Sequence, residues 1–195
     1  AVGHPRYAEL VGDQSISISE VQSFLSAKEA LFFLTAHEWG AFAIVVTKSD
    51  QQIYRISQAD ISNSVELVKE LRETVDMSKV KVRSDITPFN THAAFIVYKH
   101  LFGPAESLLK GVDHLLVVPT GVFEAIPFAM LVTERKDIDA AYKDTAWFIK
   151  RNAITRLPAV SSIKSLRSIK RPESIRVGSF IGFGNPLLDG KTGTL

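Results

Sequence analysis

The sequence predicts an α/β fold in which a parallel β-sheet begins but is not completed. Three patterns indicate this class: a set of short strand-like runs, a stretch with helical spacing, and a buried strand that ends in a turn. The buried strand covers residues 112–118, and Pro119-Thr120-Gly121 follows it. A short apolar run without alternation is typical of a strand covered on both faces, as in a parallel sheet between helices.

The strand-like runs come earlier in the chain and are expected to pair with one another. They cover residues 30–37, 41–47 and 51–56. The connections between them are very short, and short connections join antiparallel neighbours. We therefore expect an antiparallel β-meander.

Helical patterns lie on either side of the meander. Before it, Ser19 and Gln22 fit a capping box that opens a short helix through Leu25. After it, two apolar stripes with helical spacing predict helices at residues 65–77 and 89–101, with Gly103-Pro104 ending the second. A further short turn of helix is expected at residues 106–110. The apolar residues of the first stripe are Val65, Val68, Leu71 and Val75.

Beyond the buried strand, the order of elements predicts a sheet that continues. We expect a charged loop at 133–144, short strands at 147–150 and 153–157, an amphipathic basic helix at 158–169 and a strand at 175–183. A sheet of only two parallel strands is not stable on its own, so we expect the chain to be the N-terminal part of a larger α/β unit. The expected organisation is a linker at 1–14, the meander and helices at 15–111, and the first part of the parallel sheet at 112–195.

Composition narrows the classes of function. The 195 residues include no cysteine, which excludes disulfides, thiolate metal sites and a cysteine nucleophile within this chain. Neither an apolar run long enough to span a membrane nor a leader pattern is visible, so a cytoplasmic protein is the simplest expectation. Residues 1–142 have 13 Lys and Arg against 18 Asp and Glu, whereas residues 143–195 have 10 against 3. The basic segment suggests an acidic partner or packing surface, but the aromatic platforms of nucleic-acid binders are missing.

Several known catalytic and ligand-binding motifs are absent, because the residues of this sequence do not have the required spacing. Gly184 to Thr192 resembles a phosphate-binding loop, but five residues separate its glycines where the motif needs four, and Pro186 removes an amide donor. The five histidines have no ligand spacing for a metal. No Gly-x-Ser-x-Gly occurs, and no serine is placed near a convincing His and Asp. We expect no cofactor and no metal.

Ligand sites of open α/β sheets lie beyond the carboxyl ends of the strands. On this topology, the candidate wall of a substrate pocket is formed by five residues at two strand ends: Thr120, Gly121, Val122, Gly184 and Asn185.

The order of motifs along the chain resembles the CHAT domain. That family has an apolar strand, Pro-Asp-Gly and a Leu-x-x-Leu-Pro-Phe-x-x-Leu segment. Here Leu115-Leu116-Val117-Val118-Pro119-Thr120-Gly121 precedes Phe123-Glu124-Ala125-Ile126-Pro127-Phe128-Ala129-Met130-Leu131. Trp147-Phe148-Ile149, Ala153-Ile154-Thr155-Arg156-Leu157-Pro158 and Phe180-Ile181-Gly182-Phe183-Gly184-Asn185-Pro186 follow in a similar order. Thr120 stands where the family commonly has Asp, and Ala159 where it commonly has Ser.

The resemblance implies a caspase-like sandwich that is begun but incomplete, from a family of cysteine peptidases that usually follow tetratricopeptide repeats. The family's catalytic His and Cys lie on later strands, and no residue of this chain matches either. The chain is therefore expected to be the N-terminal portion of such an endopeptidase, inactive alone. Its expected partners are the remaining C-terminal part of the domain, a protein substrate and a tetratricopeptide or other regulatory protein, but no membrane.

Two alternatives to an artificially truncated N-terminal portion of a peptidase stay open. One is a non-catalytic CHAT-like scaffold that binds partners through the basic helix at 158–170. The other is a natural processed subunit that a second chain completes.

Overall fold

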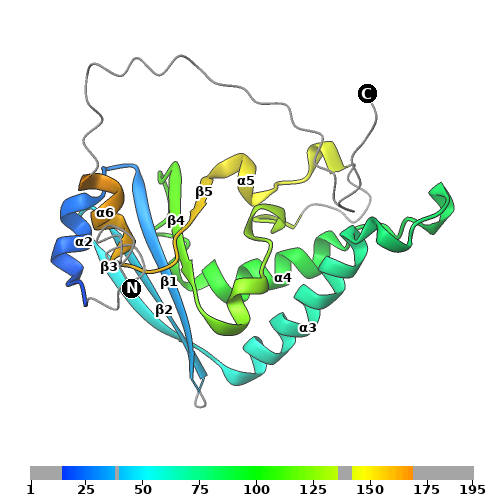
Figure 1. Cartoon of the computed structure of the whole chain (residues 1–195), viewed down its shortest axis with the longest axis horizontal. Helices are drawn as coiled ribbons and strands as arrows, with labels where there is room; N and C mark the ends of the chain where they lie inside the picture. The colour runs from blue at the N-terminus through cyan, green and yellow to red at the C-terminus, as the bar shows by residue number, and fades with distance from the viewer. Residues whose placement is uncertain (1–14, 38–39, 136–141, 169–195) are drawn as a thin grey trace, which may run out of the picture.

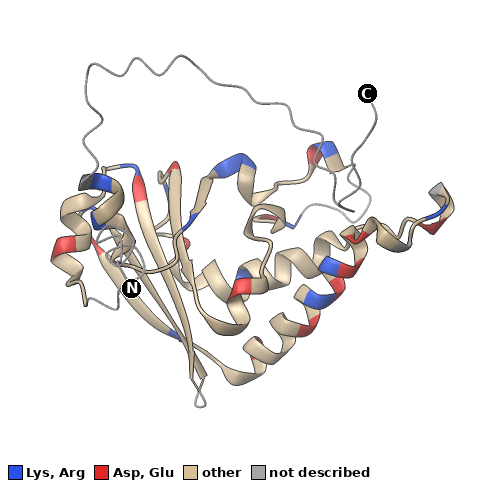
Figure 2. Ribbon diagram, viewed as in Figure 1, with Lys and Arg blue, Asp and Glu red and all other residues tan. Residues whose placement is uncertain are grey.

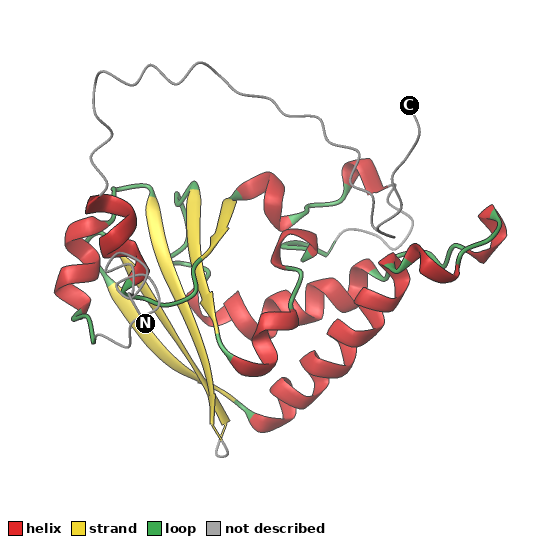
Figure 3. Ribbon diagram, viewed as in Figure 1, coloured by secondary structure: helices red, strands yellow, loops and turns green. Residues whose placement is uncertain are grey.

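A sheet lies between two layers of helices in the computed structural model, which describes residues 15–37, 40–135 and 142–168 (Figures 1 and 3). One face carries α2 (Ile18–Phe24) and α6 (Ser162–Ser168). The other carries α3 (Gln58–Val75) and α4 (Thr91–Phe102). This arrangement confirms the predicted α/β class and is consistent with part of a caspase-like fold.

The five strands of the sheet follow the order β3-β2-β1-β4-β5. Their bounds are Glu29–His37 for β1, Gly40–Thr47 for β2, Gln51–Ile56 for β3, His114–Pro119 for β4 and Ala153–Arg156 for β5. The first three form the expected antiparallel meander. β4 pairs parallel with both β1 and β5, so the parallel part of the sheet begins where the sequence predicted it.

The central strands are apolar on both sides because each side packs on a different helix layer. In β1, Phe32 faces the core shared with α3 and α4, whereas Leu31 faces the core shared with α2 and α6. All residues from Leu115 to Pro119 in β4 are buried. A strand with two covered faces has no solvent side, which explains the unbroken apolar run in its sequence.

An aromatic cluster around Phe102 joins the sheet to one helix layer. Its ring stacks on Phe32 of β1 at a centroid distance of 4.3 Å and on Tyr98 of α4 at 5.4 Å. It also meets the edges of Phe128 at 6.1 Å and Phe148 at 4.9 Å. Aromatic pairs in these geometries stabilise beyond the area they bury.

The first helix is capped two residues earlier than predicted. The capping box is formed by Ser17 and Glu20, so the prediction of Ser19 and Gln22 was wrong. Ser17 Oγ accepts a bond from the backbone N–H of Glu20, and the Glu20 carboxylate accepts one from the backbone N–H of Ser17. A charged carboxylate is a stronger acceptor than a glutamine amide, and it also complements the positive end of the helix.

Helix α3 begins seven residues before the predicted stripe and ends at Val75. Ser57 caps it by accepting a bond from the backbone N–H of Asp60. Val68 and Leu71 of the stripe are buried, but Val65 is 39% exposed and Val75 is 43% exposed. The buried face instead extends N-terminally to Ile61 and Ser64. The predicted apolar stripe was therefore wrong at Val65 and Val75, because the prediction left out Ile61, which lies on the buried face of the helix.

The strand predicted at residues 147–150 is wrong, since these residues enter the short helix α5 (Phe148–Arg151). Only Trp147 makes a β-bridge, with Val132. The helical turn of α5 places the Phe148 ring against Phe102 in the aromatic cluster just before the chain enters β5. Four residues with two apolar positions do not distinguish a helical turn from a strand.

Helix α6 begins at Ser162, four residues after its predicted start, and the 106–110 segment forms hydrogen-bonded turns rather than a helix. The strand expected at 175–183 lies outside the described residues. Short 3₁₀ helices complete the fold: Met77–Lys79, Arg83–Asp85, Gly103–Ala105, Gly121–Ala125, Phe128–Met130 and Tyr142–Asp144. Within the described residues, no helix combines the length and the apolar character that crossing a bilayer requires.

Candidate functional site at the carboxyl edge of the sheet

The carboxyl ends of β1, β4 and β5 lie at one edge of the sheet because these three strands are parallel. Thr120 follows β4 directly at this edge. Its backbone N–H and its hydroxyl both donate to the carbonyl of Leu34 in β1, each at 3.0 Å. These two bonds extend the pairing of β1 and β4 by one residue and hold Thr120 at the strand end.

Gly121 turns the chain away from the strand. Its φ is +56°, a left-handed conformation that glycine adopts without strain. No heavy atom lies within 4 Å of the position where a Cβ would be, so conformation alone favours glycine here. The turn sends Val122 outward, where it is 48% exposed, and Phe123 into the core, where it is 1% exposed.

An apolar cavity of about 600 Å³, the sheet-edge groove, adjoins Thr120 on the face that carries α2 and α6. Its floor includes Phe33, Ile44 and Val118 from three strands, and the 158–161 segment after β5 forms one wall. Cavities of this size and character accommodate apolar groups of ligands. The groove therefore offers a binding surface where strand ends of parallel sheets usually place one.

A second cavity, the helix groove, lies on the opposite face and has a volume of about 470 Å³. Val122 lines it together with Val65 and Val68 of α3 and Ile126. Thr120 and Val122 are thus brought to two different grooves, on either side of the same turn. Gly184 and Asn185, the other two predicted wall residues, lie outside the described residues.

The partly buried carboxylate of Glu29 connects four elements at the opposite, amino edge of the parallel strands. Glu29 of β1 accepts a bond from Arg167 of α6 at 2.6 Å, and its Oε1 lies 3.2 Å from Nδ1 of His114 in β4. The other ring nitrogen of His114 lies 2.8 Å from the hydroxyl of Thr155 in β5. Burial alone would raise the pKa of Glu29, but hydrogen bonds from Ser26 and Arg167 outweigh it and lower the pKa.

A serine, a histidine and an aspartate also meet, which the sequence did not indicate. Ser64 Oγ lies 3.0 Å from Nδ1 of His100, and Nε2 of His100 lies 3.4 Å from the Asp60 carboxylate. Asp60 and Ser64 are four residues apart on α3, so they share one side of the helix. Because Ser64 is 2% exposed, the set joins α3 to α4 rather than presenting a nucleophile. Within the described residues, no group of acidic and histidine side chains could hold a metal ion.

A third polar network fixes α5 beside the carboxyl end of α4. Arg151 donates to Glu106 and to the Tyr98 hydroxyl, both at 2.5 Å, and Tyr98 donates to Glu106. Burial and the bond to Glu106 raise the pKa of Tyr98, which keeps the phenol neutral. Burial opposes the charge on Arg151, but Tyr98 and Glu106 outweigh it and raise its pKa. The Asn152 amide donates to the Val112 carbonyl at 2.6 Å, so this network also sets the start of β5.

A match to a protein-family model identifies the family of this chain. The family model of the CHAT domain matches residues 92–192, slightly more than half of the chain. The chain belongs to the CHAT domain family. No curated protein matches it. The CHAT match begins in α4 and includes β4, the Pro119-Thr120-Gly121 turn and β5, so the Thr120 turn lies inside the family region, whereas β1 lies outside it.

Membership in the CHAT family identifies the module. What the carboxyl edge can do chemically depends on the residues that lie there. The carboxyl edge supplies a turn, a hydroxyl and two apolar grooves. The chain has no cysteine, so it contributes no thiolate to this edge.

Proposed function

We propose that this chain is the N-terminal part of a caspase-like cysteine endopeptidase and forms one wall of its peptide-binding cleft. The observation that carries the proposal is the position of Thr120. It lies at the carboxyl edge of three parallel strands and borders a 600 Å³ apolar groove. Apolar side chains of an extended polypeptide fit such a groove, whereas Thr120 offers a polar rim.

The chemistry of such a peptidase comes from a cysteine thiolate and a histidine. The thiolate attacks the peptide carbonyl, and the histidine transfers a proton to the leaving amine. The chain has no cysteine. Two of its described histidines, the partly buried His114 and His100, are engaged with Glu29 and Thr155 and with Ser64 and Asp60, respectively. In the proposal, both catalytic groups come from the rest of the CHAT domain, and this chain holds the substrate.

Peptide cleavage by the polypeptide that contains this chain and the remaining CHAT domain tests the proposal. Ala159→Phe places a ring in the sheet-edge groove, so KM for an unstructured protein substrate should rise at least several-fold while kcat changes little. Ile149→Phe is a matched control, because Ile149 is 50% exposed and lines neither groove. The 195-residue chain alone should cleave nothing.

Two outcomes contradict the proposal. One is a longer polypeptide that does not cleave the substrate, or whose cleavage survives alkylation of its thiols. The other is an unchanged KM for Ala159→Phe. The first outcome would favour the rival function, a non-catalytic scaffold.

The rival function, a non-catalytic scaffold, is compatible with the lack of cysteine in this chain, as the peptidase proposal is. The scaffold was expected to bind through the basic helix at 158–170. In the structure, Arg167 of that helix is bonded to Glu29, and Lys164 lies close enough to Glu20 to lower its pKa together with the Ser17 hydrogen bonds. These contacts direct part of the helix's charge into the fold, which favours the peptidase wall over the scaffold.

A further inference from the structure

The segment between α3 and α4 projects beyond the rest of the molecule. Residues 76–87, here named the arm, extend from the ends of the two helices away from the sheet (Figure 1). Three of its large apolar side chains are exposed: Met77 by 54%, Val82 by 57% and Ile86 by 45%. Single exposed apolar residues are ordinary, but three on one projecting segment mark a contact surface.

Local hydrogen bonds, rather than core packing, give the arm its shape. The Asp76 carboxylate accepts a bond from the backbone N–H of Ser78 at 3.0 Å. The Asp85 carboxylate accepts bonds from the backbone N–H groups of Lys81 and Val82, both at 3.1 Å. The two acidic side chains are thus used inside the arm. The arm is preformed while its apolar side chains stay in water, which lowers the entropy cost of docking.

The arm also has a distinct charge pattern. Its sequence Lys79-Val80-Lys81-Val82-Arg83 alternates basic and apolar residues. In the structure, the two ends of this run belong to the 3₁₀ helices Met77–Lys79 and Arg83–Asp85, and Lys81 between them is exposed beside the exposed Val82. A complementary surface needs an apolar floor and carboxylates around it.

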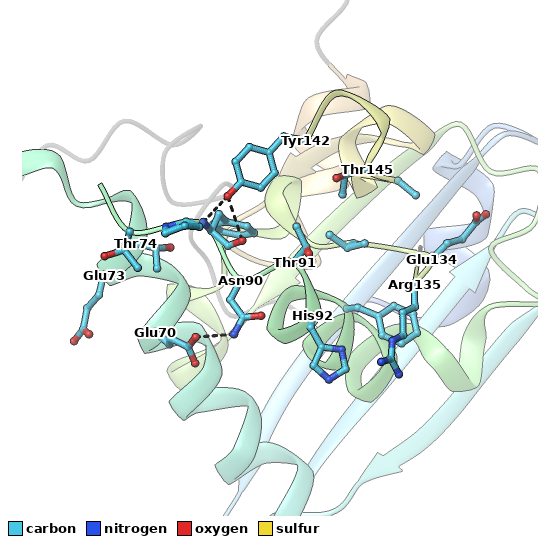
Figure 4. A pocket seen from close by; sticks show the side chains of 16 residues that line it. Glu70, Glu73, Thr74, Asn90, Thr91, His92, Glu134, Arg135, Tyr142 and Thr145 are labelled. Atoms are coloured by element: carbon cyan, nitrogen blue, oxygen red, sulfur yellow. Dashed lines mark hydrogen bonds between the residues drawn. The ribbon is translucent and has the colours of Figure 1, made fainter. Parts of the chain in front are cut away.

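A cavity with these properties lies at the base of the same arm. It has a volume of about 570 Å³, and its lining includes three carboxylates and three aromatic rings: Glu70, Glu73, Glu134, Phe89, Phe95 and Tyr142. Figure 4 shows Tyr142 over one end, where its hydroxyl accepts a bond from the Phe89 N–H at 2.7 Å. Arg135 and His92 also line it, so acidic groups outnumber the permanently charged base by three to one. We call this cavity the aromatic-acidic groove.

The arm and the aromatic-acidic groove lie at the same end of the α3–α4 pair, and Thr87 at the end of the arm lines the groove. The arm itself extends away from the sheet (Figure 1). A two-fold axis beside this end would set each arm against the groove of a second molecule. Such a contact is closed and uses the same surface twice. Figure 2 shows charges of both signs along the adjoining α3.

We propose that the chain forms a two-fold dimer in which each arm docks in the aromatic-acidic groove of a second copy. Val82 and Ile86 contact the aromatic floor, and Lys81 faces the carboxylates. The proposed peptidase activity depends on the sheet-edge groove, which shares no lining residue with the aromatic-acidic groove.

Sedimentation equilibrium of the 195-residue chain over a wide concentration range tests the dimer. The weight-average mass should rise from 21.5 kDa toward twice that value, and the rise should shift to higher concentration with added salt. Val82→Asp should raise the dissociation constant at least tenfold. Ile149→Asp, at a site 50% exposed and distant in sequence from the arm, should leave it unchanged.

A charge exchange then identifies the two surfaces. Lys81→Glu alone and Glu134→Lys alone should each weaken self-association, since each creates two like-charge pairs in a dimer. Mixing the two variants should restore association, because every arm then meets an opposite charge. A chain that stays at 21.5 kDa at all concentrations overturns the proposal, as does association that Val82→Asp leaves intact. A mixture that associates no better than its two components also overturns it.

Discussion

At the scale of single residues, Gly121 determines how the chain leaves the carboxyl edge. Its φ of +56° directs Val122 to one groove and leaves Thr120 at the other. Gly121→Ala meets no neighbouring atom and should therefore lower the free energy of unfolding by about 1 kcal/mol, the cost of a left-handed conformation for an L-residue. Gly121→Asn should cost less, because asparagine tolerates this region better. Denaturant unfolding measures both, and a larger loss with Asn than with Ala would contradict the argument.

At the scale of elements, the bond between Glu29 and Arg167 holds α6 against the sheet. The pKa of Glu29 is lowered in the folded chain, so the folded state favours the ionised form. This contribution is complete above the ordinary glutamate pKa of 4.5 and is lost as the pH falls through the lowered value. Amide hydrogen exchange should therefore show α6 opening below about pH 4.5 before the strands open.

The variant Glu29→Gln provides the control for this pH dependence. It removes the titrating group while nearly keeping its shape, so α6 should be less protected at neutral pH and change little on acidification. If α6 of the variant still opened in step with acid as the original does, another group would have to carry the effect.

At the scale of the whole molecule, Phe102 connects the sheet to several elements that pack on one of its faces. Its ring contacts β1, the Phe128 segment and α5 in addition to its own helix. Phe102→Ala should lower the free energy of unfolding by about 3 to 5 kcal/mol, as for large buried aromatic residues elsewhere. Leu166→Ala, at a position 46% exposed, should change it by less than about 0.5 kcal/mol. Circular dichroism during denaturation measures both, and equal effects would show that the aromatic cluster is not central to stability.

The elements differ in how well the sequence predicted them, and the reason is physical. β1, β2 and β3 were predicted to within one residue at each end because short connections and apolar strands leave few alternatives. α5 was missed because a four-residue segment takes its conformation from Phe148, whose ring is drawn into a cluster built from distant parts of the chain. The α3 stripe was misplaced because the buried side of a helix depends on which neighbour covers it.

The candidate site was predicted in the same uneven way. The turn at Thr120 and Gly121 could be located because strand ends of parallel sheets are predictable from the order of elements. That Thr120 and Val122 would line different grooves could not be predicted, since it depends on the φ of one glycine and on α3 packing beside the turn. The meeting of Ser64 with His100 likewise follows only from the packing of α3 on α4.

By itself, the sequence determined the α/β class, the antiparallel meander, the start of the parallel sheet and the resemblance to the CHAT family. These features depend on local periodicity, chain connection and residue identity, all of which are present before folding. Only the tertiary structure decided the two grooves beside the turn, the Glu29 contacts and the projecting arm. The grooves and the Glu29 contacts depend on the distance between residues far apart in the chain, which packing sets, and the direction of the arm depends on the packing of α3 and α4.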